Sequence, residues 1–164
     1  RFCPIFQDVY QKISGSDEQV DVRYESHLAE GESALEAFAT SRDRDRALQY
    51  TSRGVHKDDL KFTIRGFPIK KLGSQGQQKT FVIALKIAQF EFLRTANGFK
   101  PLLLLDDIFD KLDDSRVEAI IRMVNDHQFG QIFITDTHPE RTEETVKRVN
   151  ESYSMYRIKK GQVV

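Results

Sequence analysis

The sequence has little of what several structural classes require. Its 164 residues include one cysteine, Cys3, and four histidines, which excludes an internal disulfide and leaves no zinc-binding spacing. The apolar runs, of which Phe81–Leu85 is one, are much shorter than the roughly 20 residues of a membrane-spanning helix. A secretory leader pattern is also missing, so we expect a soluble, cytoplasmic protein with no membrane partner.

The chain also lacks net charge, because 25 Lys and Arg residues balance 25 Asp and Glu residues. Charge alone therefore gives no preference for nucleic acids or membranes. The local balance is different: residues 53–71 carry six cations and two anions, whereas residues 104–118 carry six acids and two cations. The first amino acid is Arg1 instead of Met, from which we expect a piece of a longer chain.

The spacing of apolar residues predicts an α/β fold. Residues 2–13 and 81–93 have apolar side chains at helical intervals, and the second helix is expected to end near Gly98. Leu102–Leu105 and residues 131–135 are short apolar runs, typical of parallel strands that are covered on both faces. The alternation of helices and strands indicates a parallel sheet flanked by helices.

Capping signals and alternating patterns predict the remaining elements. Ser115–Glu118 and Thr137–Glu140 have the spacing of capping boxes, which predicts that a helix begins at each of them. Residues 60–72 indicate a β-hairpin that turns at Arg65–Gly66, and residues 153–158 indicate a final strand.

Two adjacent acids directly follow the first apolar run. Asp106 and Asp107 should lie at the carboxyl edge of the sheet, where open α/β folds bind ligands. Their repulsion and desolvation raise the cost of ionising both, and Mg²⁺ removes this cost, since it binds one or two carboxylates together with phosphate oxygens. In a Walker B arrangement the first acid holds Mg²⁺ and the second orients or deprotonates the attacking water. The alternative is an ordinary strand end with a helix-capping aspartate.

A second polar segment, Gly73–Lys79, comes directly before the helix of residues 81–93. Its serine hydroxyl, glycine backbone and position at a helix N-terminus together favour anion binding. The segment is not a P-loop, which requires G-x-x-x-x-G-K-[ST], because two glutamines separate Gly76 from Lys79, and no other stretch of the sequence matches. The main phosphate cradle of a nucleotide site is therefore missing from this sequence.

These motifs resemble those of a known family. Ser74-Gln75-Gly76-Gln77-Gln78 is similar to the ABC-type signature S-G-G-Q-Q, and Asp106-Asp107 with the following Asp110-Lys111-Leu112-Asp113 is similar to a Walker B motif and its D-loop. Together with Thr51–Leu60, which resembles T-x-x-G-x-H-[RK]-D-D-L, they come in the order found in the RecF family. The resemblance covers roughly residues 50–137. It implies the C-terminal lobe of a P-loop NTPase, an ABC-type ATPase head, over residues 50–164, and a helical arm or junction over residues 1–49.

The resemblance implies an ATP site that two protomers share. The signature residues would act on ATP held by the partner protomer; they are Ser74, Gln75, Gly76 and Gln77. Asp106 would bind Mg²⁺ and Asp107 would be the catalytic base for ATP of its own protomer, with Asp110 and Asp113 in the D-loop. Hydrolysis would be slow, since ABC heads usually carry the longer Glu where Asp107 stands. Without a Walker A loop, this chain alone would be inactive.

The resemblance also implies a role in recombinational DNA repair. The family would bind DNA at single-strand/double-strand junctions, form ATP-dependent homodimers, and act with recombination mediator proteins and a recombinase. Two other functions remain open from the sequence. One is the head of an SMC-like chromosome-organising ATPase, which would need long heptad arms. The other is a non-catalytic module that binds a partner protein.

Some other polar residues have two interpretations. His138 resembles the switch histidine of ABC heads, a sensor of the γ-phosphate, but it lies two residues late, and a capped helix start explains it as well. His56, Asp58 and Asp59 are close together in sequence, but without a further His or Cys nearby they favour a structural or nucleotide-adjacent role over a separate metal site. The cations of residues 53–71 either contact DNA phosphates or are simply solvated.

Overall fold

The computed structural model describes residues 1–28, 31, 33–107, 112–125, 130–149 and 152–164. They form two compact units, one made of residues 1–18 and 73–164 and the other of residues 19–72. This division differs from the expected boundary between residues 49 and 50, because the N-terminal helix packs against a helix near the middle of the chain. None of the described helices combines the length and the apolar character that crossing a bilayer requires.

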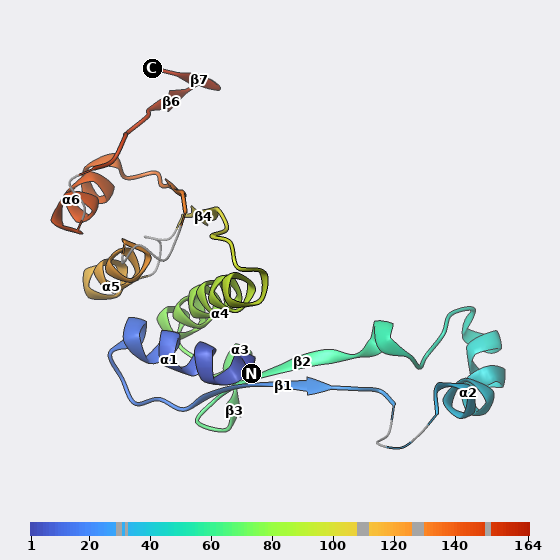
Figure 1. The fold of residues 1–164 in the computed structure, drawn as a ribbon. Coiled ribbons are helices and arrows are strands. Elements are labelled where there is room, and N and C mark those ends of the chain that lie inside the picture. Colours follow the sequence, from blue (N-terminus) through green and yellow to red (C-terminus); the bar gives the residue numbers. More distant parts are fainter. Residues whose placement is uncertain (29–30, 32, 108–111, 126–129, 150–151) are drawn as a thin grey trace. The chain divides into compact units, whose positions relative to one another are not determined.

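The first unit is built on the long helix α4 (Gln75–Asn97), against which α1 (Phe2–Ser14) packs. Figure 1 shows the two helices side by side. The contact is aromatic: the ring centroids of Phe6 and Phe81 lie 4.7 Å apart in an edge-to-face arrangement, and Tyr10 also meets Phe81. Because edge-to-face pairs stabilise beyond the area they bury, this contact fixes the start of α4.

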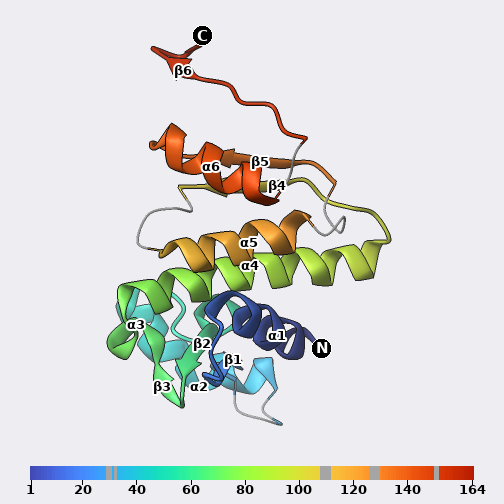
Figure 2. The same ribbon diagram turned by 90° about the vertical axis from the view of Figure 1, so that its left-hand side faces the viewer.

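Two parallel strands, β4 (Leu103–Asp106) and β5 (Ile132–Thr135), confirm the predicted α/β fold. Figure 2 shows them next to each other. The expectation that both faces of the first strand are covered is wrong, because Leu103 is buried whereas Leu104 is 72% exposed. In the described part of the chain β4 pairs with β5 alone, and no further layer covers the face that carries Leu104.

Helix α5 (Asp114–Asn125) begins close to the predicted position, but a different residue caps it. The carboxylate of Asp113 accepts the main-chain N–H of Arg116 at 2.9 Å. The predicted cap, Ser115, instead donates its hydroxyl to Asp113. An ionised carboxylate is a stronger acceptor than a hydroxyl, which explains why the earlier residue takes the cap. The helix buries its predicted apolar stripe, formed by Val117, Ile120, Ile121 and Val124.

Helix α6 (Pro139–Val149) begins close to the predicted position, and the carboxylate of Asp136 holds the residues at its start. Asp136 accepts the main-chain N–H of His138 at 3.2 Å and the hydroxyl of Thr142 at 2.7 Å. The aspartate thereby connects the end of β5 to the first turn of the helix.

The final strand predicted over residues 153–158 is wrong. The structure has a small hairpin there, made of β6 (Ile158–Lys159) and β7 (Gln162–Val163), which are antiparallel. The two turn residues, Lys160 and Gly161, have positive φ angles of 52° and 79°. Two consecutive residues with positive φ are the geometry of a type I′ turn, which matches the twist of hairpin strands. The Lys-Gly pair therefore decides where the strands form.

The second unit is a three-stranded antiparallel sheet of β1 (Val20–Glu25), β2 (Asp59–Ile64) and β3 (Phe67–Pro68). The predicted turn at Arg65–Gly66 is confirmed, but the strand that follows it has only two residues. It passes into the short helix α3 (Ile69–Leu72). Pro68 lacks the N–H that a longer ladder needs, which is consistent with the early end of the strand.

Between β1 and β2 the chain forms the helix α2 (Ala34–Leu48) and the single 3₁₀ turn η1 (Val55–Lys57). Ser33 caps α2, and Glu36 completes a capping box. At the other end of the helix, the carboxylate of Asp45 accepts the main-chain N–H of Ser52 at 2.9 Å, so the chain after α2 is held to the helix.

Candidate functional site

Asp106 and Asp107 lie at the carboxyl end of β4, where the sequence predicts them, and both are exposed. The neighbouring strand ends in Thr135, whose hydroxyl donates a hydrogen bond to the Asp106 carboxylate. The main-chain carbonyl of Thr135 accepts the N–H of Asp107 at 3.0 Å. The end of β5 therefore holds both acids through a single residue.

The acid pair offers the donors that magnesium prefers, but too few of them. Asp106 and Asp107 supply carboxylates and Thr135 a hydroxyl beside them, and Mg²⁺ favours such oxygen ligands. Within the described ranges, no group of three or more His, Cys, Asp or Glu side chains is arranged to hold a metal. Mg²⁺ commonly takes one or two carboxylates and completes its shell with water and phosphate oxygens. The residues present therefore fit a magnesium ion that binds together with a nucleotide.

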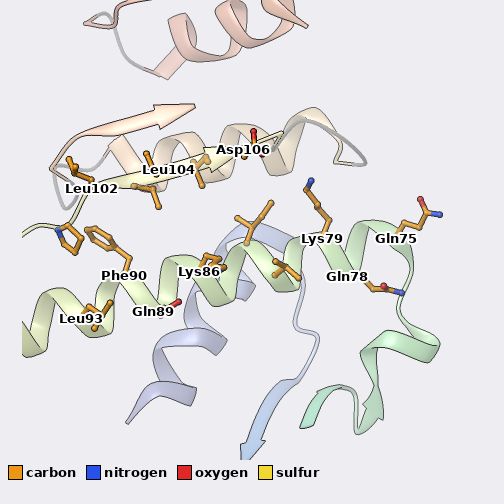
Figure 3. A pocket seen from close by; sticks show the side chains of 15 residues that line it. Gln75, Gln78, Lys79, Lys86, Gln89, Phe90, Leu93, Leu102, Leu104 and Asp106 are labelled. Carbon is orange, nitrogen blue, oxygen red and sulfur yellow. The ribbon is translucent and has the colours of Figure 1, made fainter. Parts of the chain in front are cut away.

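Asp107 has an unusual backbone conformation, with a φ of 50°. Among residues with a side chain, Asp and Asn are several times more common than others in this left-handed region. The main-chain carbonyl of Asp107 accepts a hydrogen bond from the Lys79 ammonium at 2.9 Å. Figure 3 shows the Lys79 side chain reaching from α4 toward the end of β4. The two segments predicted to form the site are thus connected directly.

The polar segment before α4 is shaped by its own side chains. Ser74 is the N-cap: its hydroxyl oxygen accepts the Gln77 N–H at 3.2 Å, and the Gln77 side chain accepts the Ser74 N–H at 2.8 Å. The Gln77 amide also donates to the carboxylate of Glu18 at 2.7 Å, and the Gln78 amide donates to the Gly73 carbonyl at 2.8 Å. Both glutamines therefore fix the turn, and the Glu18 bond joins it to the end of the N-terminal segment.

Ser74, Gln75 and Gly76 lie at the start of α4. Ser74 and Gln75 are exposed, and Gly76 is half-buried in the first turn of α4. The first N–H groups of a helix have no partner within it, and the helix dipole makes this end positive. A glycine in the first turn also allows a close approach of the ligand to the backbone. This end of α4 therefore suits a phosphate group, as the residue types predict.

Between α4 and β4 lies a groove of about 820 Å³. Its polar end is formed by Gln75, Lys79 and Asp106, and its apolar end by side chains that include Leu93 and Leu102 (Figure 3). The apolar part continues onto the exposed face of β4. The groove therefore leads from Asp106 along the exposed side of β4.

The two predicted D-loop residues have different outcomes. Asp110 lies outside the described residues. Asp113 is exposed and accepts hydrogen bonds from the Ser115 hydroxyl and the Arg116 N–H, and these bonds, the Ser115 bond most, lower the pKa of its carboxyl group. The structure thus assigns Asp113 the task of capping α5. A role of Asp113 toward a nucleotide stays a prediction.

His138 is exposed and directly precedes α6. Its main-chain N–H donates to Asp136, and its ring Nδ1 lies 3.1 Å from the Thr137 hydroxyl oxygen. These are contacts of a helix start, which was the alternative interpretation of these residues. The role of His138 as a γ-phosphate sensor stays a prediction.

The polar residues around His56 belong to the second unit and hold its loops. The ring Nε2 of His56 lies 2.9 Å from the Thr51 hydroxyl oxygen. The Asp58 carboxylate accepts the Tyr24 hydroxyl and, at 2.7 Å, the His27 N–H. These bonds lower the pKa of Asp58, the Tyr24 bond most. These contacts are of the structural kind that the sequence favours for His56 and Asp58, and a role next to a nucleotide stays a prediction.

Sequence reasoning missed three residues that hold the site: Glu18, Lys79 and Thr135. Their bonds to the predicted residues span 59, 28 and 29 positions of the chain, so no local pattern shows them. Thr135 carried one usable signal, because it ends the second apolar run and the carboxyl ends of parallel strands share an edge. The sequence gives no such signal for Lys79, since a single lysine in the first turns of a helix is usually solvated.

Curated relatives match the chain over nearly its whole length. The DNA replication and repair protein RecF of Flavobacterium johnsoniae is 57% identical over 157 residues, which is 96% of this chain and 44% of that protein. The protein of the same name from Parabacteroides distasonis is 52% identical over 162 residues, which is 99% of this chain and again 44% of the relative. The chain thus spans less than half the length of the curated relatives it matches. No family model matches it.

Two solved structures share its fold. The recombination mediator protein RecF-ATPrS in the RecFOR pathway superposes with a TM-score of 0.71 and 24% identity, over 99% of this chain and 43% of that one. A structure on ATP-driven dimerization and DNA-stimulated activation of SMC ATPases has a TM-score of 0.55 and 15% identity, over 99% of this chain and 81% of that one. At these identities the likeness concerns the fold alone, and it confirms the predicted α/β fold with a parallel sheet flanked by helices.

Proposed function

Because this chain belongs to the RecF family, we propose that it forms the signature and Walker B part of the ATPase head of a DNA repair protein. Its relatives in Flavobacterium and Parabacteroides are named for DNA replication and repair. The SMC-like alternative has less support, since the SMC structure is only 15% identical to the chain. We expect the protein to work in the cytoplasm.

The observation that carries this proposal is the exposure of two adjacent acids at the carboxyl end of a parallel strand. Two neighbouring carboxylates repel each other, and a strand end that serves only the fold does not need both. Beside a bound nucleoside triphosphate, one acid can bind Mg²⁺ and the other can act on the attacking water. The bonds from Thr135 to Asp106 and Asp107 support this interpretation, because they hold both acids in place before a ligand binds.

Asp106 and Asp107 would have separate tasks at the ATP of their own protomer. Asp106 would give a carboxylate oxygen to Mg²⁺, which would neutralise charge that develops on the phosphates. Asp107 would orient the attacking water or accept its proton, from a position that its main-chain bonds to Thr135 and Lys79 define. The phosphates themselves would be bound by a Walker A loop elsewhere in the protein, so this chain alone would hydrolyse no ATP.

Ser74, Gln75 and Gly76 would contact ATP held by a second protomer, while Gln77 keeps their turn in shape. Binding of ATP would then join two heads as a homodimer, and hydrolysis would release them. DNA at single-strand/double-strand junctions, recombination mediator proteins and a recombinase are the partners that we propose. Their support is the family membership and the similar RecF structure, which is that of a recombination mediator protein in the RecFOR pathway.

The experiment that tests this function is Asp107→Asn in the full-length protein. Asn tolerates the left-handed backbone as well as Asp does, so the variant removes the charge and keeps the conformation. We expect ATP turnover to fall by about 10²-fold or more, as for loss of a general base, while nucleotide-dependent dimers persist or last longer. Turnover at the wild-type rate would refute the role of Asp107.

Ser74→Arg separates the shared site from the site of the single protomer. A bulky side chain at the N-cap would block the approach of a second nucleotide-bound head. We therefore expect loss of ATP-driven dimers in sedimentation or light-scattering measurements, with unchanged ATP binding by the monomer. Dimers that persist would show that Ser74 does not face the nucleotide of the partner.

A further inference from the structure

We propose that Lys79 is a positioning residue, which holds the backbone of Asp107 from the same helix that presents Ser74 to the second protomer. Lys79 would thereby connect the part of the chain that meets the partner's nucleotide to the acid that acts on the protomer's own nucleotide. This inference rests on the proposed function, because it gives Lys79 a task in that shared ATP site.

The first step is that Asp107 depends on outside contacts for its conformation. Residues with a side chain rarely adopt a φ of 50°. Two bonds hold this one: the main-chain N–H of Asp107 donates to the Thr135 carbonyl at 3.0 Å, and its carbonyl accepts from the Lys79 ammonium at 2.9 Å. The first bond continues the β4–β5 ladder and does not depend on side chains. The second depends on the cationic side chain of residue 79.

The second step is that Lys79 is anchored firmly enough to act as a support. The next two residues, Thr80 and Phe81, are 0% and 3% exposed, and the Phe81 ring packs on Phe6 with a centroid distance of 4.7 Å. The backbone of α4 at Lys79 is therefore part of the packed core. The lysine side chain extends from this backbone toward the end of β4, where Asp106 lies (Figure 3).

The third step is the distance between Lys79 and the signature residues. Ser74 precedes Lys79 by five positions, which is about 7.5 Å along a helix axis, and the capping box makes the intervening turn regular. This turn and the anchored backbone at Lys79 therefore form one continuous segment, so the helix that presents Ser74 to the partner's nucleotide also sets where the Lys79 ammonium meets the Asp107 carbonyl. Through that bond Lys79 would fix the direction of the Asp107 carboxylate.

The chemistry of the contact favours a cation. Hydrogen bonds with an ionised donor are roughly twice as strong as neutral ones, and an ammonium also offsets the repulsion between the neighbouring carboxylates of Asp106 and Asp107. Arg would keep both effects. Met has a similar length and flexibility but neither a charge nor a donor, so it isolates the contribution of the contact.

The test compares Lys79→Met, Lys79→Arg and the control Lys86→Met in the full-length protein. Lys86 is an exposed lysine of α4 that borders the same groove and has no part in the proposed site. For Lys79→Met we expect kcat and the single-turnover hydrolysis rate to fall about 10- to 100-fold, the cost of misplacing a catalytic group by about 1 Å. KM for ATP and ATP-driven dimers should stay near wild type. Lys79→Arg should recover most of the rate, and Lys86→Met should match the wild type.

Three results would overturn the inference: a wild-type rate for Lys79→Met, a loss confined to KM, or a rate for Lys79→Arg as low as that for Lys79→Met. Asp107→Asn, measured in parallel, separates this inference from the proposed function. If Asp107→Asn is slow and Lys79→Met is normal, the assignment of Lys79 fails and the ATPase assignment stands. If Asp107→Asn hydrolyses ATP normally, the proposed function itself fails.

Discussion

Thr80 provides a direct test of how α4 is held in the core. The residue is 0% exposed, and its hydroxyl oxygen has no hydrogen-bond partner among the described residues. Thr80→Val replaces the hydroxyl by a methyl group and keeps the branched shape. The variant therefore removes an unsatisfied polar atom from a packed environment without opening a cavity.

The size of the effect follows from the cost of burying such a group. An unpaired buried hydroxyl costs roughly 1–3 kcal/mol, and Thr and Val have similar helix propensities. We therefore expect Thr80→Val to raise the free energy of opening α4 by about 1–2 kcal/mol, which corresponds to a factor of about 5–30 in the opening equilibrium.

Hydrogen exchange of the α4 amides in the full-length protein measures this free energy where exchange reports the opening equilibrium. Thr95→Val is a matched control on the same helix, because Thr95 is exposed and donates its hydroxyl to the Glu91 carbonyl at 2.9 Å. We expect the control to change stability by less than about 0.5 kcal/mol. Reduced protection in Thr80→Val would show that the hydroxyl has a partner, and would refute the reasoning.

Two further predictions concern carboxylates whose pKa the fold lowers. The hydrogen bond from the Tyr24 hydroxyl is the main cause that lowers the pKa of Asp58, so the folded second unit favours the ionised carboxylate. The contribution of Asp58 to stability is therefore complete above the unfolded pKa of about 3.9 and is lost as the pH falls through the lower folded pKa. Asp58→Asn should flatten this acid limb in denaturation midpoints measured between pH 6 and pH 2.5, and an unchanged limb would contradict the assignment. Asp113→Ala should destabilise α5 by about 1 kcal/mol, the usual loss for a removed N-cap, whereas Ser115→Ala should cost clearly less. Equal losses of stability in urea unfolding would show that Ser115 caps the helix as much as Asp113 does.

The parts of the fold that the sequence predicts are those that local physics decides. The apolar periodicity of α1 and α4 and the short apolar runs of β4 and β5 identify these elements, because each pattern lies within one segment. The final strand over residues 153–158 failed for a related reason. A two-residue turn with positive φ at Lys160 and Gly161 places the strands later in the chain. In the part of the chain that the structure describes, the alternating residues 153–157 before this hairpin pair with no strand.

The sequence predicts the motifs of the site but not the residues that hold these motifs in place. Asp106 and Ser74 were identified because a strand end and a helix start are visible in the sequence. Glu18 and Lys79 act through contacts that join distant segments, and only the packing of α1 and β4 near α4 brings them together. The predicted cap of α5 is wrong for a third reason: the carboxylate of Asp113 competes with the neighbouring hydroxyl of Ser115, and spacing alone does not rank the two kinds of acceptor.

The backbone at Asp107 gives a reason for the short acid at this place, where ABC-type heads usually have Glu. A residue with a longer side chain in the left-handed region costs roughly 1–2 kcal/mol, whereas Asp is tolerated there. The φ of 50° aims the carbonyl at Lys79 and the N–H at Thr135, so a change to Glu would strain both bonds. An Asp reaches one methylene less far, so under the proposed function the main chain would have to bring it to the attacking water. Slow hydrolysis and dependence on Lys79 would then have the same origin, because the backbone, and not the length of the side chain, would set the position of the acid.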